Sequence, residues 1–235
     1  MTSTVGSRSL LDALGEVRDP ELDEPITALG FVASAEVSDA GVATVHLRLP
    51  TYFCAPNFAY LMVADAYDAV STVDGVRHAA VVLDDHFAAD AINDGVAARA
   101  GFARSFAGEA VGELGGLRAD FLRKAVLAGT DQVCRPLVDA GATPADLARL
   151  TVGAVPPSPA LDRLLRRRSE LGLPCDAGAP LLVDPGTGAP IALAEVPLHL
   201  RKARVTRTSL DANTGICRGM LRHRYATDGQ GEEDR

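Results

Sequence analysis

The sequence contains no tryptophan, and aromatic residues make up only 5% of its 235 residues. Hydrophobic residues nevertheless account for 47%, so alanine, valine and leucine must fill most of the core. No apolar run approaches the roughly 18–20 residues that a membrane-spanning helix needs, and we expect no membrane partner. The N-terminus also lacks the apolar segment of a secretory signal, so we expect a cytoplasmic protein.

Closely spaced cysteine pairs are absent as well. The chain has four cysteines far apart in the sequence: Cys54, Cys134, Cys175 and Cys217. Because structural zinc sites usually draw on ligand pairs at short spacing, this distribution argues against a preformed zinc site. Disulfides are not expected in a reducing cytoplasm. The nucleophile elbow, the P-loop and the glycine fingerprint of dinucleotide-binding folds are also missing, and we predict that the protein is not an enzyme.

Charge is distributed unevenly along the chain, although the net charge is only −8. Residues 1–100 carry 15 acidic and 5 basic side chains, whereas residues 161–225 carry 6 acidic and 11 basic ones. An acidic front and a basic rear indicate two modules that dock on each other or on a partner. We predict a domain over residues 1–100, an extension over residues 101–225 and a disordered tail over residues 226–235.

The first hundred residues predict a two-layer α/β sandwich with the element order α-β-β-α-β-α around a small mixed sheet. The first helix carries an apolar stripe of Leu10, Leu11, Leu14 and Val17. In the second strand, Val45, Leu47 and Leu49 alternate with polar residues and should be buried. The remaining elements are strands over 30–37, 42–49 and 76–83, and helices over 56–72 and from about residue 88.

The second half predicts an α+β extension of unknown fold. A long helix is expected over 117–140, and Thr143 is expected to cap a helix that begins at Pro144. A basic amphipathic helix follows over 161–171. Residues 181–183 and 191–193 flank a glycine-rich turn and predict a β-hairpin. A strand over 198–205 and a short helix from Thr214 to Leu221 complete the expected extension.

Cys54 is the residue with the clearest chemical implication. It lies in the segment Pro50-Thr51-Tyr52-Phe53-Cys54-Ala55-Pro56, between a predicted strand and a predicted helix. The dipole and the free backbone N–H groups of a helix N-terminus favour a thiolate, the form of cysteine that binds metal. A packed loop thiol is the alternative interpretation.

Four segments carry a resemblance to a known family. They are Val17-Arg18-Asp19-Pro20-Glu21-Leu22, Ile26-Thr27-Ala28-Leu29-Gly30-Phe31-Val32, Leu49 to Pro56, and Val73-Asp74-Gly75-Val76. With these segments, the first hundred residues resemble the iron–sulfur cluster assembly domain family of the SufT/PaaD-like (MIP) type. In that family a proline directly follows the cysteine, whereas Ala55 intervenes here. Residues 101–235 carry no resemblance that we can name.

The resemblance implies an accessory factor that assembles an iron or iron–sulfur centre or delivers it to a client apo-metalloenzyme. A multicomponent di-iron monooxygenase is one client class, since some bacterial relatives accompany such enzymes. The resemblance makes Cys54 a ligand for transiently bound iron, with Glu21 and Asp19 as supporting carboxylates. Asp19 and Glu21 are alternatively explained by helix termination and turn formation. One thiolate cannot hold a cluster, so a homodimer or the client must supply further ligands.

Three further residues are candidate metal ligands on residue type alone. His86 follows Asp84 and Asp85, and this trio has the chemistry of a hard or borderline metal site, although a solvated strand end is the simpler interpretation. Cys175 follows a proline in a loop, and Cys217 lies beside Arg218. Both are candidates for a ligating or reactive thiol. Cys134 is expected to be buried in a helix.

Two other functions remain open. Basic residues gather at 163–168 and 201–207, and the segment 143–150 is similar to the start of a helix-turn-helix, which together would suit a nucleic-acid-binding regulator. We nevertheless do not expect nucleic acid as a partner, because the chain is net acidic and lacks interleaved aromatic residues. The second alternative is a metal-free scaffold or chaperone for an enzyme complex.

Overall fold

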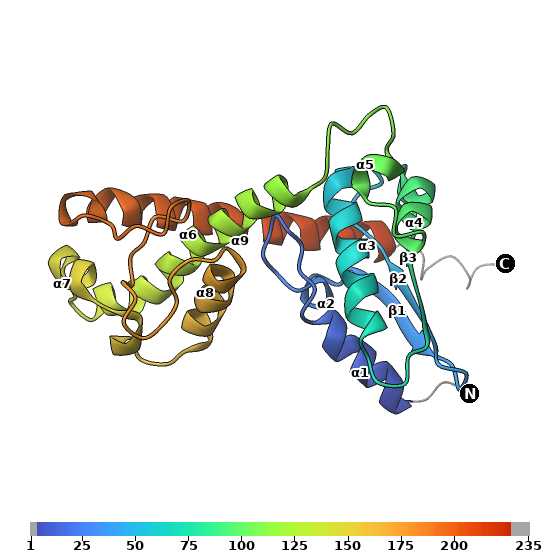
Figure 1. The fold of residues 1–235 in the computed structure, drawn as a ribbon, viewed down its shortest axis with the longest axis horizontal. Coiled ribbons are helices and arrows are strands. Elements are labelled where there is room, and N and C mark those ends of the chain that lie inside the picture. Colours follow the sequence, from blue (N-terminus) through green and yellow to red (C-terminus); the bar gives the residue numbers. More distant parts are fainter. Residues whose placement is uncertain (1–3, 227–235) are drawn as a thin grey trace. The chain divides into compact units, whose positions relative to one another are not determined.

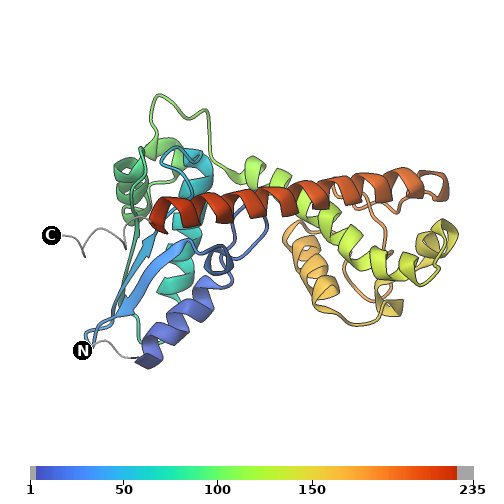
Figure 2. The same ribbon diagram turned by 180° about the vertical axis from the view of Figure 1, so that it is seen from behind.

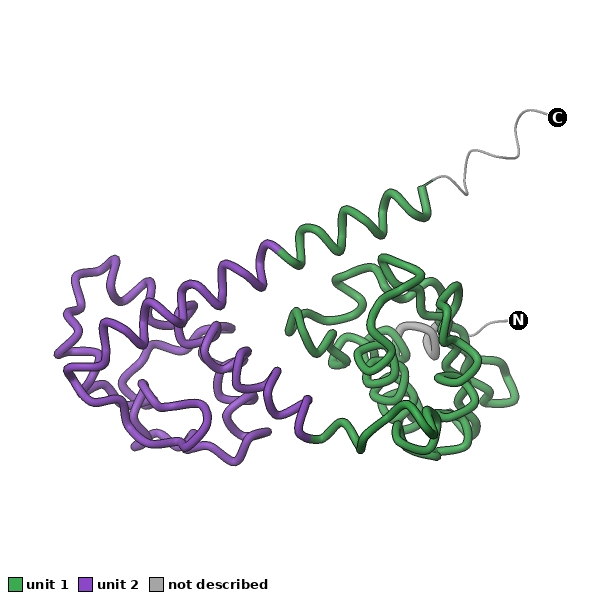
Figure 3. The backbone as a smooth tube through the Cα atoms, turned by 90° about the horizontal axis from the view of Figure 1, so that it is seen from above, with its two compact units in different colours: residues 1–115, 213–235 green, residues 116–212 purple. Residues whose placement is uncertain are grey.

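The computed structural model describes residues 4–226, and it describes side chains from Ser9 onward. Clustering of the backbone divides the chain into two compact units, drawn in different colours in Figure 3. The first unit comprises residues 1–115 and 213–235, and the second comprises residues 116–212. The first unit therefore includes residues 101–115 and a segment near the C-terminus. The predicted disordered tail lies outside the described residues, apart from Ala226.

The first unit begins with helices and a sheet in the predicted order (Figure 1). Its elements are α1 (Thr4–Leu14), α2 (Ile26–Leu29), β1 (Val32–Val37), β2 (Val42–Leu47), α3 (Pro56–Ser71), β3 (His78–Leu83), α4 (Ala89–Ala97) and α5 (Phe102–Ser105). The sheet order is β1-β2-β3, with an antiparallel β1–β2 pair and a parallel β2–β3 pair. This small mixed sheet with flanking helices confirms the predicted α/β sandwich.

One face of the sheet packs on the core of the first unit. Val45, Leu47 and Leu49 are 0%, 1% and 2% exposed, as their alternation predicts. Leu10 and Leu14 of α1 are fully buried in the same core, whereas Leu11, which the predicted stripe included, is 47% exposed. Leu11 is displaced by about 100° around the helix from Leu10, which places it at the margin of the buried face.

The second unit is helical, and its packed residues form a separate core. Its elements are α6 (Gly115–Asp139), α7 (Pro144–Arg149), η1 (Val152–Ala154), α8 (Pro159–Glu170), η2 (Leu193–Glu195) and the first part of α9 (Val196–Ala226). Thr143 caps α7 as predicted: its side chain accepts a hydrogen bond from the backbone N–H of Asp146, which returns one to the backbone of Thr143.

Two predictions for the extension need correction. The expected hairpin is reduced to one antiparallel bridge between Val183 and Pro190, with Asp184 Oδ1 closing the turn between them. The expected strand over 198–205 and the short helix from Thr214 to Leu221 are wrong, because both segments belong to the continuous helix α9.

The spacing of buried residues in α9 shows why the strand prediction fails. Val196, His199 and Ala203 are buried, and so are Thr214 and Leu221 further along. Steps of three, four and seven residues follow the helical period, while a strand would bury alternate residues. Leu198, the first residue of the expected strand, is 52% exposed.

The part of α9 from Asn213 onward packs within the first unit; Figure 2 shows it from behind, in red. Leu221 is buried in the first core, and its Cδ2 atom lies 3.3 Å from where a β-carbon on Gly30 would stand. Gly30 ends α2 with φ +79°, a left-handed conformation that glycine adopts without strain. Within residues 4–226 we find no helix both long and apolar enough to cross a bilayer.

Candidate functional site

The candidate site forms where β2 and β3 end. Because these strands are parallel, the loops that follow them, Pro50–Ala55 and Asp84–Ala88, emerge at the same edge of the sheet. The backbone N–H of Phe87 donates a hydrogen bond to the carbonyl of Tyr52 (3.1 Å), which joins the two loops directly. The second loop therefore restrains the segment that contains Cys54.

His86 holds the backbone of Cys54 through a hydrogen bond. Its Nε2–H donates to the carbonyl oxygen of Cys54 (2.7 Å), while its Nδ1 accepts from the backbone N–H of Ala88 (3.1 Å). These bonds assign the Nε2–H tautomer. Burial lowers the pKa of the imidazole, so it is neutral at physiological pH. Since both ring nitrogens are engaged, this geometry favours a positioning role for His86 over the predicted role as a metal ligand.

Cys54 itself is half-buried and lies two residues before the first residue of α3. Its Sγ lies 3.3 Å from the hydroxyl oxygen of Thr51, and its side chain packs on the edge of the first core. Ala55 occupies the N-cap position and Pro56 the first helical position. Ala55, which departs from the family pattern, therefore lies just outside α3, and α3 still begins with proline.

Arg224 of α9 holds both loops at once, and no sequence signal identified it. One terminal nitrogen donates to the carbonyl of Leu49 (3.0 Å), and the other donates to the carbonyl of Asp85 (2.7 Å) and pairs with its carboxylate. A guanidinium offers several donors in a fixed plane, which suits this clamp between loops that are distant in sequence.

Asp19 closes the turn that the Asp-Pro-Glu motif predicts. Its Oδ1 accepts hydrogen bonds from the backbone N–H groups of Glu21 (2.9 Å) and Leu22 (2.8 Å). The residue is 7% exposed, and burial raises its pKa from 3.8 to about 6 despite these two bonds. The turn-forming role is therefore present, and it leaves a buried carboxyl that changes charge near neutral pH.

The structure places Cys217 in the same electrostatic environment as Cys54, Asp19 and Glu21. It lies on α9, half-buried against the same core that receives Cys54. Burial, together with the negative charges of Asp19, Cys54 and Glu21, raises the pKa of its thiol to about 11. The Cys217 thiol thus responds to the charges of Cys54, Asp19 and Glu21, which are distant from it in the sequence.

The same negative charges that disfavour a second thiolate favour a cation, because a bound metal ion reverses the effect of neighbouring anions. Thiolate and carboxylate together suit iron or zinc. No three Cys, His, Asp or Glu side chains between residues 4 and 226 already surround a point where a metal could bind. The arrangement is a loose cluster of donors, and it would need movement or outside ligands to close around a metal.

The other two cysteines differ from this pair. Cys175 is exposed and belongs to the second unit. Cys134 is 1% exposed within α6, and burial raises the pKa of its thiol to about 12, which confirms the predicted packing role.

Aromatic side chains gather beside Cys54 and face solvent. Phe53, Phe87 and Tyr52 are 76%, 49% and 45% exposed. Their ring centroids lie 5.0 to 6.3 Å apart, in edge-on and tilted arrangements. In a chain with only seven Phe and four Tyr, three exposed rings in contact are a feature of the surface that packing does not explain. We call Tyr52, Phe53 and Phe87 the aromatic patch.

Several arginines that suggested a nucleic-acid interface are engaged within the second unit. Arg168 is fully buried and donates to the carbonyls of Pro180 (3.0 Å) and Leu181. Arg167 pairs with Glu170, and Arg207 pairs with Asp131 (2.6 Å) and Asp211 (2.5 Å). These side chains stabilise the unit and contribute little to a phosphate-binding face.

Taken together, the mixed three-stranded sheet and its flanking helices define a small α/β domain, and the Cys54 loop lies where two parallel strands of that sheet end. The model of a family described as iron-sulfur cluster assembly protein matches residues 8–82. The N-terminal region therefore matches an iron–sulfur cluster assembly domain. A search of curated proteins and a search of solved structures gave no match.

Proposed function

We propose that this protein is an accessory factor that assembles or delivers an iron or iron–sulfur centre for a client apo-metalloenzyme. The assembly domain at residues 8–82 supports the role in cluster assembly. The observation that carries the finer proposal is the shared electrostatic environment of Cys54, Cys217, Asp19 and Glu21. Such a cluster attracts a cation without enclosing it, which suits a protein that passes its cargo on.

In this proposal Cys54 binds the iron as a thiolate, and its proton must leave when the metal arrives. Asp19 carries a buried carboxyl with a pKa of about 6, so near neutral pH it is able to take up that proton or to bind the iron itself. Glu21 and Cys217 contribute negative charge and further donors. Because a cluster normally needs about four protein ligands, the client or a second copy of the chain supplies the rest.

The aromatic patch supports a handover between two proteins. Phe53 is the residue directly before Cys54 and is 76% exposed. Exposed aromatic residues are typical anchors in protein interfaces, since they bury a large area at low entropic cost. A client that covers the patch would bring its own ligands next to the Cys54 sulfur.

The client class and the second unit extend the proposal. We assign client recognition to the second unit, and we propose a multicomponent di-iron monooxygenase as the first client class to test, because bacterial relatives of the resembled family accompany such enzymes. We also keep the cytoplasm as the expected location, where reduced cysteines persist. The protein is proposed to bind and position cargo, with no catalysis of its own.

The first experiment compares iron content after anaerobic reconstitution with iron and sulfide. We expect Cys54→Ser to lose most of the bound iron and Cys217→Ser to lose part of it. Cys175→Ser is the matched control, because it removes an exposed thiol in the second unit. Equal iron content in wild type and Cys54→Ser would refute the ligand role, and loss in Cys175→Ser would move the site to the second unit.

The second experiment separates metal binding from transfer. Phe53→Ser removes an anchor of the aromatic patch but no metal donor, so we expect normal iron content and slower activation of the client. A metal-free scaffold would behave differently: client binding and client activation would survive the loss of Cys54. Unchanged activation by both Cys54→Ser and Phe53→Ser would therefore favour the scaffold over the delivery factor.

A further inference from the structure

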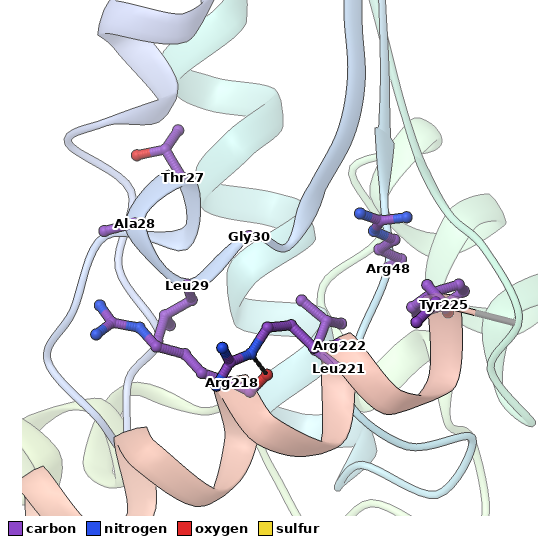
Figure 4. A pocket seen from close by; sticks show the side chains of 10 residues that line it. Thr27, Ala28, Leu29, Gly30, Arg48, Arg218, Leu221, Arg222 and Tyr225 are labelled. Carbon is purple, nitrogen blue, oxygen red and sulfur yellow. Dashed lines mark hydrogen bonds between the residues drawn. The ribbon is translucent and has the colours of Figure 1, made fainter. Parts of the chain in front are cut away.

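A cavity lined by arginines lies in the first unit, where the end of α2, the end of β2 and α9 meet (Figure 4). It has a volume of 960 Å³ and is lined by Gly30 and Thr27 from the α2 region, Arg48 after β2, and Arg218, Leu221 and Tyr225 from α9. Arg222 lines it as well. None of the candidate metal donors lines this cavity.

The cavity concentrates positive charge in the acidic part of the chain. Three guanidinium groups, from Arg48, Arg218 and Arg222, line it, and its lining contains no carboxylate. Within residues 4–226, none of the three forms an ion pair. Three arginines without an ion-pair partner among the described residues, in an acidic part of the chain, favour an anion as the ligand of this cavity.

Polar atoms in the cavity lack hydrogen-bond partners among the described residues. The Nε atoms of Arg48 and Arg218 and the hydroxyl of Tyr225 are buried without a partner. A buried donor that makes no hydrogen bond costs on the order of 1–3 kcal/mol, so such groups are rarely left unmet without reason. All three atoms belong to residues that line the same cavity, but each atom is itself covered, so an oxyanion there would bind the terminal guanidinium nitrogens of these arginines.

The positions of these donors are fixed by contacts around them. The Arg48 guanidinium stacks 4.7 Å from the centre of the Tyr225 ring. Arg222 Nε donates to the carbonyl of Arg218 (3.3 Å), the bond drawn as a dashed line in Figure 4. Burial raises the pKa of Tyr225, so its hydroxyl stays protonated and able to donate. The guanidinium groups of Arg48 and Arg222 therefore each have one contact that orients them before a ligand arrives.

We propose that this cavity binds a small molecule that carries several negatively charged oxygens, either a polyphosphate or a polycarboxylate. The planar guanidinium group binds both kinds of oxyanion with paired hydrogen bonds. The volume exceeds what a single phosphate fills and lies within the range of cofactor-sized pockets. Leu221 and the neighbouring Leu29 provide an apolar wall for the uncharged part of such a ligand.

The test is calorimetric titration of the full chain at low ionic strength, with pyrophosphate and citrate as probes. We expect at least one probe to bind with a micromolar dissociation constant, and Arg218→Gln and Arg48→Gln to weaken it about tenfold or more. Arg77→Gln is the matched control, because Arg77 is exposed in the same unit and does not line the cavity. Preference for pyrophosphate or for citrate identifies which oxyanion the site takes, and either preference supports the proposal.

A second measurement does not depend on the variants. The ligand should raise the thermal midpoint of the wild-type protein in a concentration-dependent way, because it binds only the folded state. Binding of neither probe, or equal weakening by Arg77→Gln and Arg218→Gln, would overturn the proposal. Cys54→Ser should bind the probes as wild type does, because Cys54 does not line the cavity. The anion-binding proposal and the metal-binding proposal are therefore tested independently.

Discussion

Asp19 shows, at the scale of one residue, how a turn motif yields a titrating group. Its side chain closes the turn through two backbone N–H groups, which would hold a carboxylate charged in water. Burial outweighs both bonds and raises its pKa to about 6. The Asp-Pro-Glu motif predicted the turn, but it contained no information on burial.

Asp19→Asn is expected to stabilise the protein at neutral pH. The fold favours the protonated carboxyl, so its stabilising contribution is complete below the ordinary pKa of 3.8 and is lost as the pH rises through about 6. Asparagine keeps the acceptor oxygen without the buried charge. Urea unfolding should show a gain on the order of 1–3 kcal/mol at pH 7.5, shrinking towards pH 5. A gain that is independent of pH, or a loss at pH 7.5, would contradict this assignment.

His86→Ala is expected to loosen the loop that carries Cys54. The variant loses the bond to the Cys54 carbonyl, and unfolding at pH 7.5 should show a loss of about 1–3 kcal/mol. Because burial lowers the pKa of His86, its contribution is present above the ordinary value of 6.5 and fades as the pH falls. The loss should therefore be smaller at pH 5.5.

Alkylation of Cys54 provides an independent measure of the same loop. The thiol should react several-fold faster in His86→Ala, since its backbone is no longer held. His78→Ala is the matched control, because His78 is exposed on β3 of the same unit and should leave the rate unchanged. Equal rates in the two variants would show that His86 does not position the loop.

At the scale of the element, α9 decides the architecture of the first unit. Its segment from Asn213 onward brings Cys217 to the metal-binding candidates, Arg224 to both loops and five lining residues to the arginine cavity. Leu221 approaches Gly30 closely, so the helix docks where α2 ends in a residue without a side chain.

Gly30→Ala is expected to lower the free energy of unfolding by about 1–2 kcal/mol, because alanine is strained at φ +79° and its β-carbon would press on Leu221. Gly215→Ala is the matched control within α9, where nothing lies within 4 Å of an added β-carbon. That change should instead stabilise by up to about 1 kcal/mol through helix propensity. Chemical denaturation of the two variants should therefore give shifts of opposite sign.

At the scale of the whole molecule, two separate cores imply two cooperative transitions. One core surrounds the sheet and includes Leu221, and the other includes Leu164 of α8. Leu221→Ala should lower only the transition of the first unit, and Leu164→Ala only that of the second, each by about 2–4 kcal/mol. Scanning calorimetry distinguishes this from a single transition that both variants shift, which would mean that the units fold together.

The sequence by itself determined the local structure of the first unit. The alternation of Val45, Leu47 and Leu49 predicted the buried strand face, Pro56 marked the start of α3, and Thr143 marked the capped start of α7. Each of these signals depends on residues a few positions apart, so the interactions that determine the local structure lie within the segment itself. The segments around Asp19 and Cys54 likewise carried the family resemblance that the match to residues 8–82 confirms.

Tertiary structure decided which of these segments meet. Nothing local marks Cys217 as a neighbour of Cys54, Arg224 as the clamp on two loops, or Arg48 and Arg218 as walls of one cavity. A helical period shows which face of α9 is apolar, but it does not say what that face packs against. The choice of partner depends on the shape of both surfaces, and that shape exists only once the sheet, α2 and α9 have folded together.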